Sequence, residues 1–454
     1  MFTRFPRPCR RFFPIVNIRT LAVRILNSCR NRYSGFEDKV SATADRLKLS
    51  GPDRDFLYMM VKGVIVYQRY LDYAVEKASQ RSVKKFESAV LNLLRVGALQ
   101  ALILETPLYA LTNETVEAAR QLKKNHAVGL INAVLRHLPD RAELKAALSH
   151  LPEKEALAIE TSHPQWLIER WTRNFGAENC RQLAEFNNHY QKIYFRHNPF
   201  KVSWPNLQDI LKKEGFEIAV ASAGPIPFFT VDNPGDLLRS DLFSGGLFSV
   251  QDISQAQAVL LLNPQKDETV IDACAAPGGK TTLIAQMTGG KASITAYDVS
   301  PGKVELIKNE AFRLGIDFVN YGVADARTGN YAMADKILLD VPCTGTGVIA
   351  RRADLRWNRT IRQLDTLIKI QRDILTNMSN FVKDGGVLVY STCSIEPEEN
   401  WENVEWFLKS NRNFSVEDAR DFVPEKCCDN RGAIHILPHF QNETGGFAVR
   451  MRKQ

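Results

Sequence analysis

The sequence contains 454 residues, of which 44% are hydrophobic and 24% are charged, a composition typical of a folded chain of two or three domains. No run of 18 apolar residues is present, and the eight cysteines form no C-x-x-C pair, so we expect no membrane span, no metal site and no disulfide framework. A net charge of +8 suits a polyanionic partner such as a nucleic acid. With no secretory signal, we expect a cytoplasmic protein with reduced thiols, acting as a monomer.

The first residues are strongly basic. Residues 1–36 contain eight arginines and no acidic residue, a composition shared with mitochondrial transit peptides. Pro6, Pro8 and Pro14 are incompatible with an amphipathic targeting helix, and a helical apolar pattern begins at Ile18. We therefore interpret residues 1–16 as a basic tail that either faces RNA or has no binding role.

Two segments of different composition follow. Apolar residues recur at helical spacing through residues 17–150, where 86–102 predicts one long buried helix and 112–122 and 129–138 repeat the pattern. This part is predicted to be all-helical. Between residues 160 and 240, Pro, Phe and β-branched residues become frequent and short stretches alternate, which predicts a small mixed α/β module.

From residue 245 to 454, strand-like and helix-like segments alternate, which indicates a doubly wound parallel sheet. We predict strands at 269–272, 294–298, 318–323, 336–340 and 387–390, and helices at 281–287, 303–314 and 363–382, the last stopped by 384–386. In open α/β sheets, ligands bind beyond the carboxyl ends of the strands. Asp272, Asp298, Asp340 and Cys393 follow such ends, so we expect one cleft to contain them.

A glycine-rich loop, Cys274-Ala-Ala-Pro-Gly-Gly-Lys280, joins the first of these strands to its helix. A phosphate-binding P-loop requires glycine where Cys274 stands, and the dinucleotide pattern G-x-G-x-x-G is absent. S-adenosylmethionine remains, because its carboxylate suits a helix N-terminus and its ribose suits an acid after the next strand, the position of Asp298. A simple tight turn would explain the glycines but not the acids at successive strand ends.

Two cysteines follow predicted strand ends, in Asp340-Val-Pro-Cys343 and Thr392-Cys393-Ser394. Carbon 5 of cytosine is a poor nucleophile, and addition of a thiolate to carbon 6 activates it for methyl transfer. Such chemistry requires a cysteine, an acid that holds the N3/N4 edge of the base, and a proton acceptor. A buried cysteine is more often a small hydrophobic residue, and that is our interpretation of the remaining cysteines outside the loop, Cys9, Cys29, Cys180, Cys427 and Cys428.

The segments DACAAPGGKT (272–281), DVPCTGTG (340–347) and STCSIEPEEN (391–400) together resemble the RNA cytosine-C5 methyltransferase family. The resemblance implies a Rossmann-like class I methyltransferase domain and a covalent cysteine–cytosine intermediate, with Cys393 as nucleophile, Cys343 assisting product release and Asp340 positioning the base. DNA cytosine methyltransferases use the Pro-Cys cysteine instead, which leaves Cys343 as the alternative nucleophile. The resemblance implies that the residues around S-adenosylmethionine are Cys274, Ala275, Ala276, Pro277, Gly278, Gly279, Lys280, Asp298, Asp325 and Asp340.

Arginines cluster directly after the Pro-Cys motif, within residues 351–362. A run of charged residues is commonly a solvated helix face, but arginines next to an aromatic side chain also suit the binding of an unstacked RNA strand. The reaction requires such a strand, because the target base must leave its stack. The position beside the predicted site favours RNA. The predicted RNA contacts are Arg196, Arg351, Arg352, Arg356 and Trp357.

The helical part resembles the NusB-like RNA-binding domain at residues 62–64, 95–98 and 128–136, and residues 163–167 and 195–198 extend the likeness into the middle module. This combination resembles the bacterial 16S rRNA branch of the family. It implies a NusB-like domain at 17–150, a small RRM-like α/β module at 160–240 and a methyltransferase domain at 245–454, acting on 16S rRNA either free or in early small-subunit particles. The alternatives are the same chemistry on tRNA, a non-catalytic RNA-binding assembly factor and, less favoured, a DNA substrate.

Overall fold

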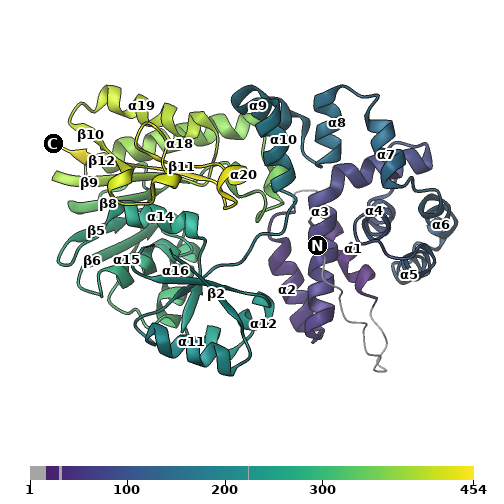
Figure 1. Cartoon of the computed structure of the whole chain (residues 1–454), viewed down its shortest axis with the longest axis horizontal. Helices are drawn as coiled ribbons and strands as arrows, with labels where there is room; N and C mark the ends of the chain where they lie inside the picture. Colours follow the sequence, from purple (N-terminus) through teal and green to yellow (C-terminus); the bar gives the residue numbers. More distant parts are fainter. Residues whose placement is uncertain (1–16, 30–32, 223) are drawn as a thin grey trace. The chain divides into compact units, whose positions relative to one another are not determined.

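The computed structural model describes residues 17–29, 33–222 and 224–454, so the predicted basic tail at residues 1–16 lies outside the described residues. The chain divides into two compact units (Figure 1). We call Met1–Asn188 with Ala353–Asn358 the helical unit, and His189–Arg352 with Arg359–Gln454 the α/β unit. Among the described helices, none is long and apolar enough to cross a lipid bilayer.

Helices build the helical unit, as predicted, and α3 and α4 contribute much of its core. At the start of α3, the Ser50 hydroxyl accepts a hydrogen bond from the amide of Asp53, which satisfies one of the free donors of the first turn. Helix α4 begins at Ser88, so Phe86, predicted to lie on that helix, is in the preceding turn. The α-helices are α1 (Ile18–Ser28), α2 (Phe36–Arg46), α3 (Gly51–Ser79), α4 (Ser88–Leu102), α5 (Leu108–Gln121), α6 (Val128–Arg136), α7 (Arg141–Leu148), α8 (Glu153–Glu160), α9 (Gln165–Phe175), α10 (Ala177–Phe186) and α17 (Leu355–Asn358).

A small antiparallel sheet opens the α/β unit and matches the predicted α/β module. Its strands are β1 (Phe195–His197), β2 (Ile218–Ser222), β3 (Pro227–Val231) and β4 (Phe248–Val250), in the order β2-β3-β1-β4, with helices α11 (Trp204–Lys213), α12 (Pro234–Leu238) and α13 (Asp241–Ser244). The buried ring of Phe195 lies 5.4 Å, centre to centre, from the rings of both Phe229 and Phe248. Aromatic packing therefore holds the strands of this module together.

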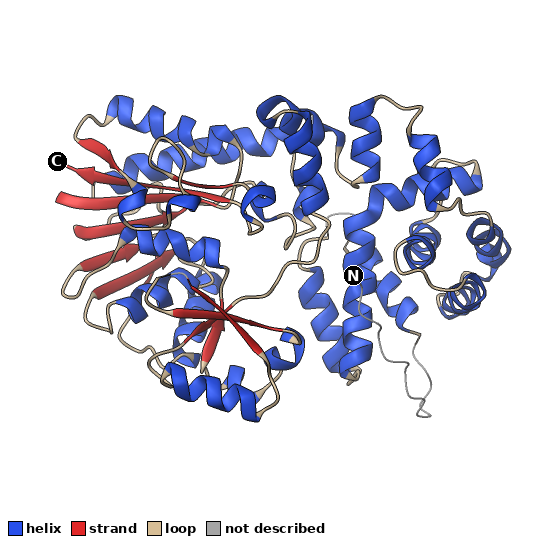
Figure 2. Ribbon diagram, viewed as in Figure 1, coloured by secondary structure: helices blue, strands red, loops and turns tan. Residues whose placement is uncertain are grey.

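The strands of the large sheet of the α/β unit are drawn in red in Figure 2. They follow the order β10-β12-β9-β8-β5-β6-β7, with β11 paired to β12. Alternate residues of its central strands face two cores: Val270 and Leu338 lie in one, Ile271 and Ile337 in the other. The strands are β5 (Thr269–Asp272), β6 (Ser293–Asp298), β7 (Asn320–Val323), β8 (Ala334–Asp340), β9 (Val382–Thr392), β10 (Phe414–Glu417), β11 (Ile434–Ile436) and β12 (Gly446–Lys453). The helices are α14 (Ile253–Leu262), α15 (Gly279–Met287), α16 (Pro301–Arg313), α18 (Ile361–Ser379), α19 (Trp401–Ser410) and α20 (Pro438–Gln441).

Two features of this sheet differ from the prediction. Helix α18 ends at Ser379, and residues 384–386 are not a stop but part of β9, where Gly385 has a φ of +74° and the pairing with β8 shifts register after Ala334. A glycine tolerates this φ, so the strand continues through an irregularity. The strands β5 to β9 are parallel as predicted, but β12 runs antiparallel to β9 and β10 antiparallel to β12.

Candidate active site

Four neighbouring parallel strands, β9, β8, β5 and β6, end at the same edge of the large sheet. Asp272, Asp298 and Asp340 are the last residues of β5, β6 and β8, and Cys393 directly follows β9. Asp340 pairs in register with Ser391, two residues before Cys393. The sheet thus brings together at one edge the residues whose clustering the sequence predicted.

The glycine-rich loop turns from β5 into α15 beside these strand ends. Gly278, the residue before α15, has a φ of +108°, and a Cβ there would lie 3.3 Å from the Cα of Ile307, so the turn requires glycine. The amide of Ala276 donates to the carboxylate of Asp298 at 3.3 Å. The loop is therefore fixed against the end of the next strand.

Arg196 of β1 supports this loop from the small sheet. Its side chain is fully buried, and its guanidinium donates to the carbonyl of Gly279 and to the hydroxyl of Thr282, both at 2.8 Å, and to the side chain of Gln251. Burial lowers the pKa of Arg196 to about 9. The predicted contact between Arg196 and RNA is contradicted by this burial, and we assign the residue to positioning the first turn of α15.

Asp340 is held by two side chains from neighbouring elements. One carboxylate oxygen accepts a hydrogen bond from the Ser391 hydroxyl at 2.9 Å, and the other lies 2.5 Å from the ammonium of Lys280. Burial lowers the pKa of Lys280, but the charge and hydrogen bond of Asp340, together with smaller contributions from Asp272 and Cys393, outweigh it and the pKa is raised. The side chain of Asp340 is 32% exposed, so a charged Lys280–Asp340 pair lies where a ligand can reach it.

The two cysteines of the predicted site are direct neighbours. The Sγ atoms of Cys343 and Cys393 lie 3.1 Å apart, and both thiols are free. The hydrogen bond to Cys393 is the largest cause of a raised pKa at Cys343, and burial and the charge of Cys393 add to it. The raised pKa keeps the Cys343 thiol protonated, and either sulfur of the pair is able to donate the hydrogen bond between them.

Glu399 joins the loops that carry the two cysteines. Its buried carboxylate accepts hydrogen bonds from the amide of Thr344 at 2.9 Å, from the side chain of Gln371 at 2.8 Å and from the Thr344 hydroxyl. The Thr344 hydroxyl also lies 3.1 Å from the hydroxyl of Ser394. Sequence reasoning missed Glu399 as a functional residue, although it lies within the Glu396-Pro-Glu-Glu-Asn400 segment of the third motif.

Two of the predicted cofactor residues, Asp325 and Cys274, have shifted pKa values. Asp325 accepts hydrogen bonds from the side chain of Arg327, 2.6 Å at the shortest, and these lower the pKa of Asp325. Burial raises the pKa of the Cys274 thiol, which keeps it protonated and unsuited to act as a further nucleophile.

Asp272 is a buried carboxyl beneath the glycine-rich loop. Burial raises its pKa to about 7, against the hydrogen bond that it accepts from the Thr281 hydroxyl at 2.7 Å, and the nearby charge of Asp340 raises it further. Because the folded state favours the protonated acid, this group stabilises the fold at low pH, and that contribution is lost as the pH rises through about 7.

Asp272→Asn removes this titration. As the pH rises from 5 to 8, wild type should lose stability that Asp272→Asn does not lose. The melting temperature of the variant minus that of wild type should therefore increase, by an amount equivalent to roughly 1–3 kcal/mol in the free energy of unfolding. Thermal unfolding across that pH range measures it. Asp317→Asn, which changes an exposed carboxylate of the same unit, is the control, and equal pH profiles for wild type and Asp272→Asn would contradict the assignment.

Comparison with known proteins identifies families along most of the chain. Residues 259–452 match the family described as 16S rRNA methyltransferase RsmB/F, residues 16–140 the NusB family, and residues 163–226 the ferredoxin-like domain of RsmF/B-like methyltransferases. A probable ribosomal RNA small subunit methyltransferase B of Synechocystis sp. is 30% identical over 446 residues, which is 97% of this chain and 100% of the relative. The Bacillus subtilis protein with the same description is 32% identical, over 90% of this chain and 92% of its own length.

The chain belongs to the RsmB/F family of 16S rRNA methyltransferases.

Solved structures share the fold of this chain. The crystal structure of PH0851 has the same fold, with a TM-score of 0.81 at 24% identity over 97% of this chain and 99% of that chain. NSun6 from Pyrococcus horikoshii, solved with SFG, has a TM-score of 0.58 at 25% identity and covers 64% of this chain and 98% of its own. The predicted combination of a NusB-like helical domain, a small α/β module and a Rossmann-like methyltransferase domain is confirmed.

The arginines of the cluster in this RsmB/F methyltransferase lie in two different units. Arg356 is fully buried in the helical unit, where its guanidinium donates to the carbonyls of Val66, Ser162 and Asn187 and to the side chain of Asn188, so its predicted RNA contact is contradicted. Trp357 packs against the hydrophobic core of the helical unit. Its indole N–H donates to the carbonyl of Ile65 at 2.7 Å, so this side-chain donor is not free for RNA.

The remaining arginines belong to the α/β unit. Arg351 pairs with Asp252 at 2.6 Å and donates to the carbonyl of Lys192, whereas Arg352 is exposed and stays a predicted RNA contact. Arg359 donates to the carbonyls of Thr344 and Cys343 and so holds the Pro-Cys loop. Among the described residues, no group of three or more His, Cys, Asp and Glu side chains is arranged to hold a metal ion.

Proposed function

We propose that this protein methylates carbon 5 of a cytosine in small-subunit rRNA, with S-adenosylmethionine as methyl donor and Cys393 as covalent nucleophile. The observation that carries the proposal is the distance of 3.1 Å between Cys393 and the protonated Cys343 at the sheet edge that also holds Asp340. The names of the relatives, ribosomal RNA small subunit methyltransferase B, support rRNA as the substrate.

The loop 274–280 and Asp298 fit S-adenosylmethionine. The carboxylate of Asp298 is buried, and one of its oxygens accepts a hydrogen bond from the amide of Ala276. The other oxygen accepts no hydrogen bond from the described residues and lies 3.4 Å from the ammonium of Lys303, so it would be able to accept from a ribose hydroxyl. Gly278 and Gly279 keep side chains off the start of α15, where the backbone amides of the first turn would be able to donate to the carboxylate of S-adenosylmethionine. Asp325 would complete the site at the end of the neighbouring strand. When bound, S-adenosylmethionine supplies an electrophilic methyl group.

The Lys280–Asp340 pair provides a means of selecting cytosine. Asp340 offers a carboxylate acceptor for the N4 amino group, and the Lys280 ammonium offers a donor for N3. Uracil presents the opposite pattern on that edge, a carbonyl at carbon 4 and an N–H at position 3. The pair therefore favours cytosine and places carbon 6 of the base for attack by Cys393.

The cysteine pair then acts in sequence. The Cys393 thiolate forms a bond to carbon 6, and the electrons of the carbon 5–carbon 6 double bond make carbon 5 nucleophilic. Once bonded to carbon 6, the Cys393 sulfur carries no charge, so the largest cause of the raised pKa of Cys343 is removed. Cys343, now more acidic, releases its proton to solvent water. Its thiolate accepts the carbon 5 proton, the electrons of the carbon 5–hydrogen bond restore the carbon 5–carbon 6 double bond, and the carbon 6–sulfur bond breaks to return Cys393 as thiolate.

The test is methylation of purified transcripts with isotopically labelled S-adenosylmethionine, followed by nucleoside analysis. We expect label in 5-methylcytidine from 16S rRNA and at least tenfold less label from tRNA transcripts. Equal or preferential labelling of tRNA would overturn the rRNA assignment in favour of tRNA. Label in another nucleoside would overturn the carbon 5 chemistry, and absence of both transfer and cofactor binding by calorimetry would indicate a non-catalytic RNA-binding factor.

A further inference from the structure

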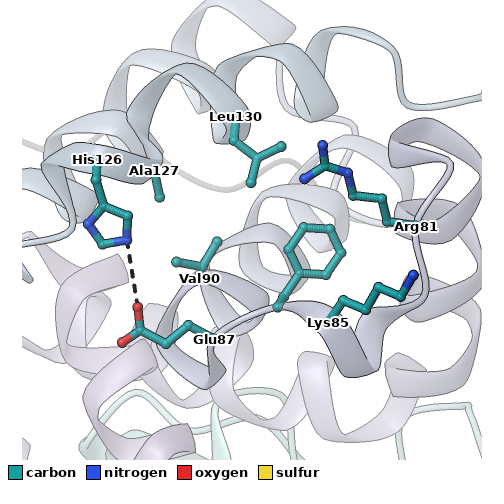
Figure 3. A pocket seen from close by; sticks show the side chains of 8 residues that line it. Arg81, Lys85, Glu87, Val90, His126, Ala127 and Leu130 are labelled. Carbon is teal, nitrogen blue, oxygen red and sulfur yellow. Dashed lines mark ion pairs between the residues drawn. The ribbon is translucent and has the colours of Figure 1, made fainter.

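A pocket of about 440 Å³ lies in the helical unit, in a part of the chain that the proposed chemistry does not use. Arg81, Lys85 and Phe86 come from the segment between α3 and α4, which includes the 3-10 turn Val83–Lys85. His126 and Leu130 come from the start of α6 and the turn before it. Figure 3 shows Arg81 and Lys85 on one side of the pocket and Glu87 and His126 on the other.

The lining combines an apolar interior with a polar rim. Val90 is buried in the helical core, and Phe86 and Leu130 are partly buried against it, so the interior presents an aromatic ring and aliphatic side chains. The pocket volume is within the range of roughly 300–1,000 Å³ that small-ligand sites occupy. An aromatic ring in such a hollow provides a stacking surface for a planar ligand.

The charge of the rim is positive. Arg81 and Lys85, which line the pocket, are exposed, and so is Lys84 beside them in the sequence. Among the described residues none of the ion pairs involves any of these three cations. The only carboxylate of the lining, Glu87, is already paired with Lys124 and lies 3.8 Å from a ring nitrogen of His126. The cations of the segment 81–85 therefore remain available to an anionic ligand.

We propose that this pocket binds one unstacked nucleotide of a single-stranded segment of the rRNA substrate. The base lies against Phe86 and Leu130, and Arg81 and Lys85 contact the phosphates on either side of it. This inference rests on the proposed function for the identity of the RNA. Single-stranded RNA fits because it combines planar bases with a phosphate on every nucleotide, as the apolar interior and cationic rim require.

The test compares two full-length double variants of equal charge change. Arg81→Glu/Lys85→Glu reverses the rim, and Arg46→Glu/Lys145→Glu reverses two exposed cations of the same unit that do not line the pocket. Filter binding of a 16S rRNA transcript is measured from 50 to 300 mM salt. We expect the rim variant to raise the Kd about tenfold or more relative to the control variant, and to reduce the salt slope by roughly 1–2, the value for two lost phosphate contacts.

A crosslink places the RNA in the pocket itself. Transcripts containing 4-thiouridine are irradiated with wild type and with the rim variant, and the crosslinked peptides are mapped. We expect a wild-type crosslink within residues 81–90 or 126–130 that the rim variant loses. Equal Kd values and salt slopes for the two double variants, or crosslinks only outside these residues, would overturn the proposal. It would also be overturned if an acidic peptide, but not unlabelled RNA, prevented the crosslink at residues 81–90 or 126–130.

Failure of this proposal is distinguishable from failure of the proposed function. If wild type binds the transcript but transfers no methyl group, the chemistry is wrong while the comparison of the two double variants still decides the pocket. If both double variants bind the transcript alike and wild type forms 5-methylcytidine, the proposed carbon 5 methylation is supported and the proposed nucleotide-binding role of the pocket is wrong.

Discussion

Replacement of Cys343 by alanine is expected to leave the protein covalently attached to its RNA. In this variant Cys393 is still able to add to carbon 6 and carbon 5 is still able to receive the methyl group. The Cys343 sulfur, 3.1 Å from Cys393, is missing, and with it the thiolate that we assign as the acceptor of the carbon 5 proton, so the carbon 6–sulfur bond does not break. Turnover should fall by a factor on the order of 10³ or more, while a single covalent complex per enzyme accumulates.

Replacement of Cys393 by alanine has the opposite signature. Without the nucleophile neither adduct nor methyl transfer is expected, a loss on the order of 10⁴ or more, but S-adenosylmethionine binding should persist because the glycine-rich loop is untouched. A denaturing gel of wild type, both variants and Cys428→Ala as a cysteine control outside the site, after incubation with rRNA and S-adenosylmethionine, separates these cases. An adduct that builds up in Cys393→Ala instead would exchange the two roles, and normal turnover by Cys343→Ala would remove the role of that residue.

The strand ends were predictable because hydrophobic strands of a parallel sheet are short, buried on both faces and followed by polar residues. Asp272 and Asp340 end such strands and Cys393 directly follows one, and parallel strands place their carboxyl ends together. The order of the strands within the sheet depends on long-range contacts and cannot be read from the sequence. A single cleft was still the simplest expectation, because polar or cysteine residues stand at the ends of four predicted strands. The antiparallel strands β10 and β12 carry no such signal, because the pairing of β12 with β9 and of β10 with β12 depends on contacts distant in sequence.

The arginine cluster was misinterpreted because composition alone does not distinguish a solvated arginine from a buried one. Arg352 and Arg356 lie four residues apart in the same basic run, but one is exposed and the other has no exposed surface. The carbonyl groups that surround Arg356 come from Val66, Ser162 and Asn187, which are remote in the sequence. Glu399 was missed for the same reason: its partners Thr344 and Gln371 lie on separate elements.

Arg356→Met should destabilise the helical unit. The guanidinium donates to three backbone carbonyls and to the Asn188 side chain at 2.9–3.2 Å, with no carboxylate among these partners. Methionine fills a similar volume but donates no hydrogen bond, so buried acceptors lose their partners at about 1–3 kcal/mol each. Burial of the guanidinium charge is itself unfavourable and lowers the pKa of Arg356 to about 9. Methionine removes this charge, which offsets part of the cost of the lost hydrogen bonds. We expect a net loss on the order of 3 kcal/mol in the free energy of unfolding.

Two measurements separate this role from RNA contact. Hydrogen exchange without RNA should show faster exchange around Val66 and Asn187 in Arg356→Met, and thermal unfolding should show a melting temperature lower by roughly 5–10 °C. Arg362→Met, which removes an exposed arginine from the same basic run, should change neither by more than the usual surface effect of about 0.5 kcal/mol. An Arg356→Met protein with wild-type stability but weakened RNA binding would restore the interpretation of Arg356 as an RNA contact, because only a guanidinium that leaves its buried site could then account for both results.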